Sequence, residues 1–163
     1  MANNERLLDP EARLKRIYRY FEQGITMKDQ IAAMQLQLQY LTSLSYSPGS
    51  PGNLSAGKVQ TSPAEEAPFA KNVEKKDELE EKLRQAIQLM IELKQQMICI
   101  INQHTVGIDN RILTLRYVEG LKIDQFMKEV HYSAKQIKRR MDKAMSEITL
   151  PDDAIWIRWR ELV

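Results

Sequence analysis

The chain has 163 residues, 43% of them hydrophobic, 28% charged and 7% aromatic, and its 24 Lys and Arg residues nearly balance its 22 Asp and Glu residues. This composition is typical of a soluble helical protein. The single cysteine excludes an internal disulfide, and two separate histidines argue against a metal cluster, so we expect no cofactor. No apolar run is long enough for a signal peptide or a membrane span, so we expect a cytoplasmic protein without a membrane partner.

Residues 1–45 are predicted to form an N-terminal helical segment. Asp9 followed by Pro10 is a typical helix start, because aspartate caps free amide groups and proline fits the first helical position. Gly24 interrupts the apolar spacing, so we expect a break there and a helix that restarts near Thr26. The apolar residues that follow recur with the spacing of a coiled-coil seam, at Met27, Ile31, Met34, Leu38 and Leu41.

Residues 46–70 are predicted to be a flexible connector rich in Pro, Gly and Ser. They contain four of the six prolines and three of the six glycines of the chain, and no regular element persists through such a composition. The connector separates two helical regions.

Residues 71–107 are predicted to form a long coiled-coil-like helix. Its apolar seam is more regular than the first one and comprises Leu79, Leu83, Ala86, Met90, Leu93, Met97 and Ile100. A second apolar row indicates a helix that is buried against more than one neighbour, and it consists of Ile87, Ile91, Ile98 and Ile101. Cys99 is interpreted as a small core residue and His104 as a polar residue at the helix C-terminus.

The two helical regions can pair in two ways, and the sequence does not choose between them. They could fold back on each other as an antiparallel hairpin within one chain, or their seams could pair between two chains in a homo-oligomer. Both arrangements make the first half of the protein all-α.

Residues 108–163 are predicted to form a helix-turn-helix domain with a C-terminal tail. A short amphipathic helix ending at Gly120 precedes a second helix over 122–130, a three-residue turn and a third helix from Ala134 to about Ile148. Ser133 is a good N-cap for the third helix. Two short helices around a tight turn form a helix-turn-helix, in which the second helix enters the major groove of DNA.

The tail after Leu150 has apolar residues at helical spacing. We expect one helical face that closes the core of the small domain, formed by Ile155, Trp156, Trp159 and Leu162. The alternative is an anchor for a partner, because tryptophan is enriched at interfaces.

The third helix of the domain separates apolar from basic residues. One side is predicted to face the core and carries Ile137, Met141, Ala144, Met145 and Ile148. Residues 134–148 hold five basic and two acidic residues, whereas residues 1–107 hold 13 of each. Base contacts are predicted for Lys135, Gln136 and Arg139, and phosphate or mixed contacts for Lys138, Arg140 and Lys143. Lys122 and Ser133 complete the predicted DNA-binding set, and a solvated basic face without a ligand is the alternative.

The segment ILTLRYVEGLKIDQFMKEVHYSAKQIKRRMDKAM is similar to region four of bacterial sigma factors. In that region an LR(Y/F)-x-x-G-L stretch precedes the DNA-reading helices, and a serine opens the recognition helix. The matching residues are Leu115, Arg116, Tyr117, Gly120, Leu121, Ser133, Ile137 and Ala144. Met127 stands where a small alanine is usual, and His131 stands where a glycine is usual in the turn. Both residues are larger, so the base preferences of sigma factors are not assigned to this chain.

The chain as a whole resembles small prophage-encoded regulators of Gram-positive bacteria that are related to the ArpU and RinA late-transcription activators. The resemblance covers nearly all of residues 10–148 and includes the connector around 57–70. It implies a double-stranded DNA-binding activator of phage late genes in the bacterial host cell, with RNA polymerase as a further partner.

The sequence has no phosphate-binding glycine loop, histidine pair or nucleophile elbow, so we expect a binding protein and not an enzyme. Two alternatives remain. One is an interaction protein that uses a sigma-like fold to bind RNA polymerase or another phage protein. The other is a phage terminase small subunit. Such a subunit should form rings, so the mass of the protein in solution distinguishes it from the other two functions.

Overall fold

A computed structural model describes residues 9–45 and 68–158, and the regular structure of these residues is entirely helical. They form five α-helices and one π-helical turn: α1 (Pro10–Ser45), α2 (Pro68–His104), α3 (Gly107–Leu113), η2 (Thr114–Val118), α4 (Ile123–Val130) and α5 (Ala134–Glu147). The predicted all-α fold is confirmed. None of these helices has an apolar stretch long enough to cross a membrane.

α1 is one continuous helix, which corrects the predicted break at Gly24. It begins after Asp9, whose backbone oxygen accepts a hydrogen bond from Arg13 N at 2.9 Å, so the predicted helix start is confirmed. A Cβ atom at Gly24 would lie 3.3 Å from Met97 Cε and 3.3 Å from the backbone oxygen of Tyr117. Gly24 is therefore a point of close approach, where the missing side chain lets α1 lie against α2 and η2.

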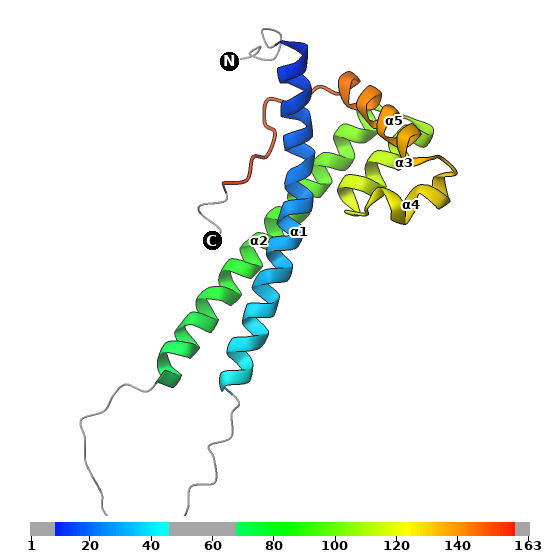
Figure 1. The fold of residues 1–163 in the computed structure, drawn as a ribbon. Helices are drawn as coiled ribbons and strands as arrows, with labels where there is room; N and C mark the ends of the chain where they lie inside the picture. The colour runs from blue at the N-terminus through cyan, green and yellow to red at the C-terminus, as the bar shows by residue number, and fades with distance from the viewer. Residues whose placement is uncertain (1–8, 46–67, 159–163) are drawn as a thin grey trace, which may run out of the picture.

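α1 and α2 run side by side in opposite directions within the chain (Figure 1). The buried residues between and around them are Ile17, Tyr20, Phe21, Met27 and Ile31 of α1 and Ala86, Leu93, Met97, Ile100 and Ile101 of α2. None of the residues 32–44 or 71–85 is buried. The buried core therefore stops short of the end of the pair at which α1 ends and α2 begins.

α2 departs from the prediction at its start and along its outer face. It begins at Pro68, so the last residues of the predicted 46–70 connector belong to the helix, and residues 46–67 lie outside the described ranges. Cys99 is exposed and not a core residue, while Ile91 and Ile98 of the predicted second row are 44% and 39% exposed. The reason is geometric, because these residues lie on a side of α2 that no other described helix covers.

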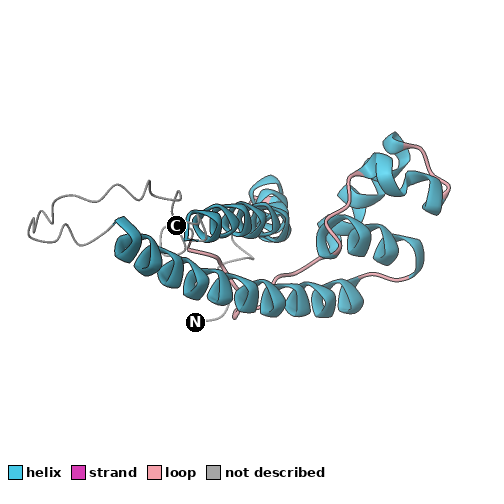
Figure 2. Cartoon of the chain, turned by 90° about the horizontal axis from the view of Figure 1, so that it is seen from below, coloured by secondary structure: helices cyan, strands magenta, loops and turns pink. Residues whose placement is uncertain are grey.

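The shorter helices gather at one end of the bowed α2 and share a continuous core with the long helices (Figure 2). η2 is a π-helical turn where an ordinary amphipathic helix was predicted. Leu115 and Tyr117 of this turn are buried, as are Ile112 and Leu113 of α3 directly before it. Gly120 has a φ of 70° and ends this stretch in the left-handed conformation, as predicted.

The described part of the C-terminal tail is not helical, which corrects the predicted helical face. Residues 151–158 run along the long helices instead of closing the core of the short ones (Figure 1). The Trp156 ring lies edge-on to that of Tyr20, with the centroids 5.7 Å apart. Trp159 and Leu162, which belong to the same prediction, lie outside the described residues.

The side chains of two glutamines on the long helices form hydrogen bonds with backbone groups of the tail, whose described part is not helical. Gln96 Oε1 accepts from Ile155 N at 2.8 Å, and Gln96 Nε2 donates to the backbone oxygen of Asp153 at 3.1 Å. In the same way Gln23 Oε1 accepts from Ile157 N at 2.7 Å, and Gln23 Nε2 donates to the backbone oxygen of Ile155 at 3.2 Å. These bonds satisfy the backbone groups of an irregular segment and fix its path over α1 and α2.

Candidate nucleic-acid interface

The turn between α4 and α5 fixes the start of α5. His131 has a φ of 58°, a left-handed conformation that favours glycine. Ser133 Oγ accepts a hydrogen bond from Gln136 N at 3.3 Å, and Gln136 Oε1 accepts one from Ser133 N at 2.9 Å. This reciprocal cap confirms Ser133 as the N-cap of α5 and holds the first helical turn in one orientation.

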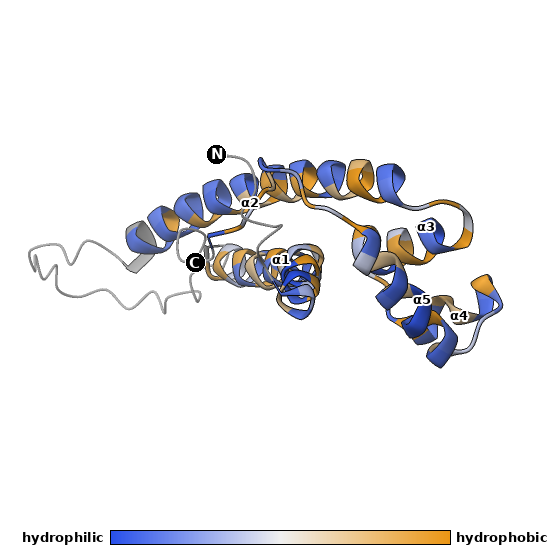
Figure 3. Ribbon diagram, turned by 90° about the horizontal axis from the view of Figure 1, so that it is seen from above, coloured by the Kyte–Doolittle hydropathy of each residue, from blue (hydrophilic) through white to orange (hydrophobic). Residues whose placement is uncertain are grey.

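α5 has a buried apolar face and an exposed basic face, as predicted. Its buried residues are Ile137, Met141, Ala144 and Met145, and Ile148 is buried directly after the helix. The exposed polar residues of the predicted site are Lys135, Gln136, Lys138, Arg139 and Lys143, and α5 is correspondingly hydrophilic in Figure 3. In the described part of the chain, the side chains of Lys135, Lys138, Arg139 and Lys143 form no hydrogen bond or ion pair. Since no acidic side chain pairs with them, this face favours an anionic ligand.

Arg140 differs from its neighbours because it is held by other parts of the protein. Its Nη1 donates to Asp109 Oδ1 of α3 at 2.7 Å and its Nη2 to Tyr132 Oη at 3.3 Å. The guanidinium carbon lies 4.7 Å from the centroid of the Tyr132 ring, a cation–π contact. The hydrogen bond to Asp109 raises the pKa of Arg140 above its ordinary value. Arg140 thus braces α5 against α3 and the turn, and its predicted phosphate contact would be made from this position.

The cap also limits what Gln136 can offer to a base. Its Oε1 accepts hydrogen bonds from both the backbone N and the Oγ of Ser133, each at 2.9 Å. A two-point contact with adenine needs the amide oxygen and nitrogen together. With the cap formed, Gln136 can offer only its amide nitrogen.

α1 covers the C-terminal half of α5. Tyr18 Oη donates to Asp142 Oδ1 at 2.5 Å, and Arg13 Nη2 donates to the backbone oxygen of Ile148 at 2.8 Å. Burial and the hydrogen bond to Asp142 raise the pKa of Tyr18, so the phenol keeps its proton as the donor in this contact. In Figure 1 the first turns of α5 lie farther from α1 than its end does. The N-terminal half of α5, with Lys135, is therefore the more accessible half.

A second group of basic residues lines an open cleft between α1, η2, α4 and α5, which we call the basic cleft. The cleft measures about 780 Å³, and its charged residues are Lys28, Asp29, Arg116, Lys122, Asp124 and Lys138. It brings the predicted site residues Lys122 and Lys138 together with Lys28 of α1. The sequence analysis missed Lys28 because it lies in the other half of the chain, within a segment interpreted only as a helical seam.

Hydrogen bonds to the loop before α4 hold two cations of the basic cleft in place. Lys28 Nζ donates to the backbone oxygen of Glu119 at 3.5 Å, and Arg116 Nη1 donates to the backbone oxygen of Leu121 at 3.0 Å. Burial and the nearby charge of Lys28 lower the pKa of Lys94 on α2. Four of the six charged residues of the basic cleft are basic, an excess of positive charge that attracts anions.

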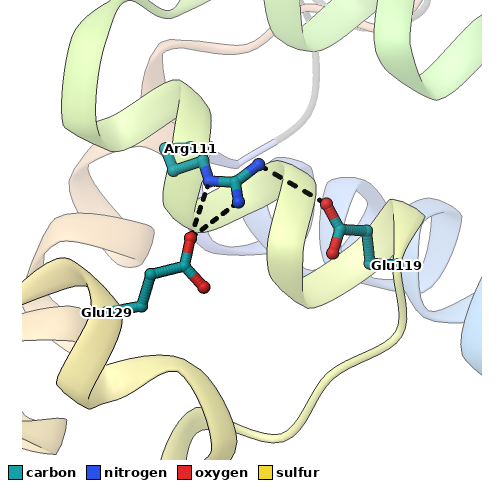
Figure 4. Close-up of polar contacts among 3 residues, drawn as sticks. All are labelled: Arg111, Glu119 and Glu129. Atoms are coloured by element: carbon teal, nitrogen blue, oxygen red, sulfur yellow. Dashed lines mark hydrogen bonds and ion pairs between the residues drawn. The ribbon is translucent and has the colours of Figure 1, made fainter.

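An ion-pair network ties α4 to α3 and to the end of η2 (Figure 4). Arg111 Nη2 and Nε donate to Glu129 Oε1 at 2.6 and 3.2 Å, and Arg111 Nη1 lies 3.5 Å from Glu119 Oε1. The hydrogen bond to Glu129 raises the pKa of Arg111. Because two carboxylates already surround this guanidinium, Arg111 positions α4 and is not counted among the candidate DNA contacts.

The described residues contain no group of three or more His, Cys, Asp and Glu side chains that could hold a metal ion. The two histidines are separate, with His104 at the end of α2 and His131 in the turn before α5. The chemistry that this part of the molecule offers is the recognition of an anion by Lys and Arg side chains.

Comparisons of the chain with protein-family models, with curated proteins and with solved structures found no match. The resemblance to sigma region four and to prophage regulators therefore rests on the sequence residues quoted above and stays a prediction.

Proposed function

We propose that the protein is a sequence-specific regulator that binds double-stranded DNA, with α5 as the recognition helix in the major groove. The observation that carries this proposal is the group of exposed basic residues on α5, Lys135, Lys138 and Arg139, which pair with no described protein group. They stand on a helix whose first turn is fixed by its cap. A helix fits the major groove, and the first turn of a recognition helix reaches the base edges.

In this proposal α4, the turn and α5 act as a helix-turn-helix of the sigma region-four kind. Lys135 and Arg139 face base edges, where arginine can bind the two acceptors of a guanine. Lys143 and Lys138 neutralise phosphates on the two sides of α5. This assignment is supported by the hollows on the two sides of α5. One is lined by Gln136, Arg139 and Lys143 together with Asp109, Tyr132 and Arg140, and the other is the basic cleft with Lys122 and Lys138.

The basic cleft extends the proposed DNA surface beyond α5. A DNA strand that passes the start of α4 would meet Lys122 and then Lys28, which the loop before α4 holds at the cleft. Lys28 belongs to α1, so the long helices would contribute directly to DNA binding. Each phosphate that is neutralised in this way adds to the salt dependence of binding.

The proposed biological role is activation of phage late genes in the bacterial cytoplasm, with RNA polymerase as a second partner and no catalytic step. This part of the proposal is supported by the sequence resemblance, because sigma region four contacts polymerase as well as DNA. The terminase alternative also requires DNA binding, and it differs from this proposal in the ring that such a subunit should form in solution.

A gel-shift titration tests the proposed function. DNA of a prophage late promoter is titrated with the wild-type protein and with Lys135→Ala and Arg139→Ala. Each substitution should weaken binding by roughly 1–3 kcal/mol if the side chain contacts a base. Lys71→Ala is the matched control, because it removes the same charge from an exposed position at the start of α2. Unchanged affinity in both α5 variants would overturn the placement of the DNA surface on this helix.

A further inference from the structure

The distal part of the helix pair, by which we mean residues 32–44 of α1 and 71–85 of α2, has no core of its own. No residue in these two ranges is buried. In the remainder of the pair, buried residues such as Phe21, Leu93 and Met97 hold the helices to each other and to the short helices. The seam residues of the distal part, such as Met34 and Leu83, are only half-buried. Because helices in water depend on burial of an apolar face, a further layer would stabilise this part of the pair.

The outer face of α1 in the distal part is apolar. Leu36, Tyr40 and Leu44 follow one another at intervals of four residues and are 67%, 63% and 42% exposed, and we call them the apolar row. The surrounding sequence, QIAAMQLQLQYLTSLS over residues 30–45, contains no charged residue. A helix that faces solvent normally carries charges on its outer face, and depletion of charge is the compositional mark of the centre of a protein interface.

A groove of about 620 Å³ lies beside the apolar row, between α1 and α2. Its apolar residues are Ala33, Met34, Tyr40 and Leu41 of α1 and Leu79 of α2, and the rest of its lining is polar, formed by Gln30, Gln37, Lys75, Glu78 and Lys82. The Oε1 atom of Gln30 is buried and has no hydrogen-bond partner among the residues that the structure describes. Tyr40 belongs to both the row and the groove lining, so the apolar row forms one edge of the groove.

We propose that the distal part is a homodimer interface and that its occupant is a second copy of this chain. A two-fold axis across this surface would pack the apolar row of each copy against the apolar row of the other, because an isologous interface uses the same patch on both chains. An uncharged row offers no attraction for nucleic acid or for a charged peptide, and the row of a second copy is a matching uncharged surface. The four distal helices would then bury the apolar row that a single chain exposes.

This inference does not depend on DNA binding. If the chain both dimerises through the distal part and binds DNA through α5, the dimer presents two α5 helices and should recognise two half-sites related by symmetry.

The mass of the full-length protein in solution, measured by light scattering over a range of concentrations, tests the proposal. The wild type should reach twice the chain mass of 19.0 kDa at micromolar concentration. The variant Leu36→Glu with Tyr40→Glu should remain at the mass of one chain, with the dimer dissociation constant raised by on the order of 100-fold or more. Both residues are exposed in the single chain and glutamate is a good helix former, so the helical circular dichroism signal should be preserved.

Gln35→Glu with Gln39→Glu is the matched control, because it adds the same two charges at exposed neighbouring positions outside the apolar row. This variant should remain dimeric. The proposal is overturned if the wild type keeps the mass of one chain at about 100 µM, a concentration well above typical dimer dissociation constants. It is equally overturned if the wild type and the double glutamate variant show the same larger mass, since the chains would then associate through another surface.

Discussion

His131 is a residue whose backbone conformation suits glycine better than histidine. Its φ of 58° places it in the left-handed region, and its side chain is exposed, so the side chain contributes little to packing. Replacing His131 with glycine should therefore remove conformational strain and raise the free energy of unfolding by about 0.5–1 kcal/mol. Chemical denaturation of the wild type and of His131→Gly measures this difference.

The control for this prediction is His131→Ala, which removes the same imidazole but keeps a side chain in the left-handed region. It should be no more stable than the wild type. If His131→Gly is less stable than His131→Ala, the turn before α5 does not have the conformation described here.

Local signals were sufficient to predict several single residues. Ser133 acts on an amide three residues away and Gly120 ends its own helical stretch, so both roles could be inferred from neighbouring residues. Lys28 and Arg140 could not be assigned in this way. Their surroundings are formed by residues distant in sequence, such as Glu119 for Lys28 and Asp109 for Arg140.

At the scale of helices, the fit of α1 against α2 and η2 depends on Gly24. A larger side chain there would push against the backbone oxygen of Tyr117, which cannot move as freely as the end of Met97. Gly24→Leu should therefore lower the free energy of unfolding by about 1–3 kcal/mol, even though leucine favours helix over glycine. Thermal and chemical denaturation both measure this loss.

Ala12→Leu provides the comparison for this variant, since it introduces leucine at an exposed position of the same helix. It should leave the stability nearly unchanged. Equal stability of Gly24→Leu and the wild type would show that α1 does not approach Tyr117 as closely as the structure describes.

The predicted helices were most accurate where the apolar period was regular and least accurate where distant contacts decide. The buried face of α5 follows directly from the spacing of Ile137, Met141 and Met145. A lone glycine such as Gly24 indicates a break, but packing against α2 and η2 outweighs its low helix propensity. The tail has helical spacing as well, yet hydrogen bonds from Gln23 and Gln96 hold it in an irregular path that no local pattern reveals.

At the scale of the whole molecule, α1 connects the two surfaces to which roles are proposed. Its N-terminal part touches α5 through Tyr18, its middle lines the basic cleft with Lys28, and its C-terminal part carries the apolar row. The core is continuous from α1 to α5, so the short helices are not an independent module beside the long ones. A dimer formed through the distal part would therefore set the distance between its two recognition helices through a packed framework.

Selection of bound sequences from a pool of random double-stranded DNA tests the central claim most directly. The wild type should enrich a defined motif, Arg139→Ala should lose preference at one position of that motif, and Lys28→Ala should keep the motif while binding more weakly and with a smaller salt dependence. Failure of the wild type to enrich any motif, or an identical motif and affinity for Arg139→Ala, would contradict the claim that α5 reads DNA.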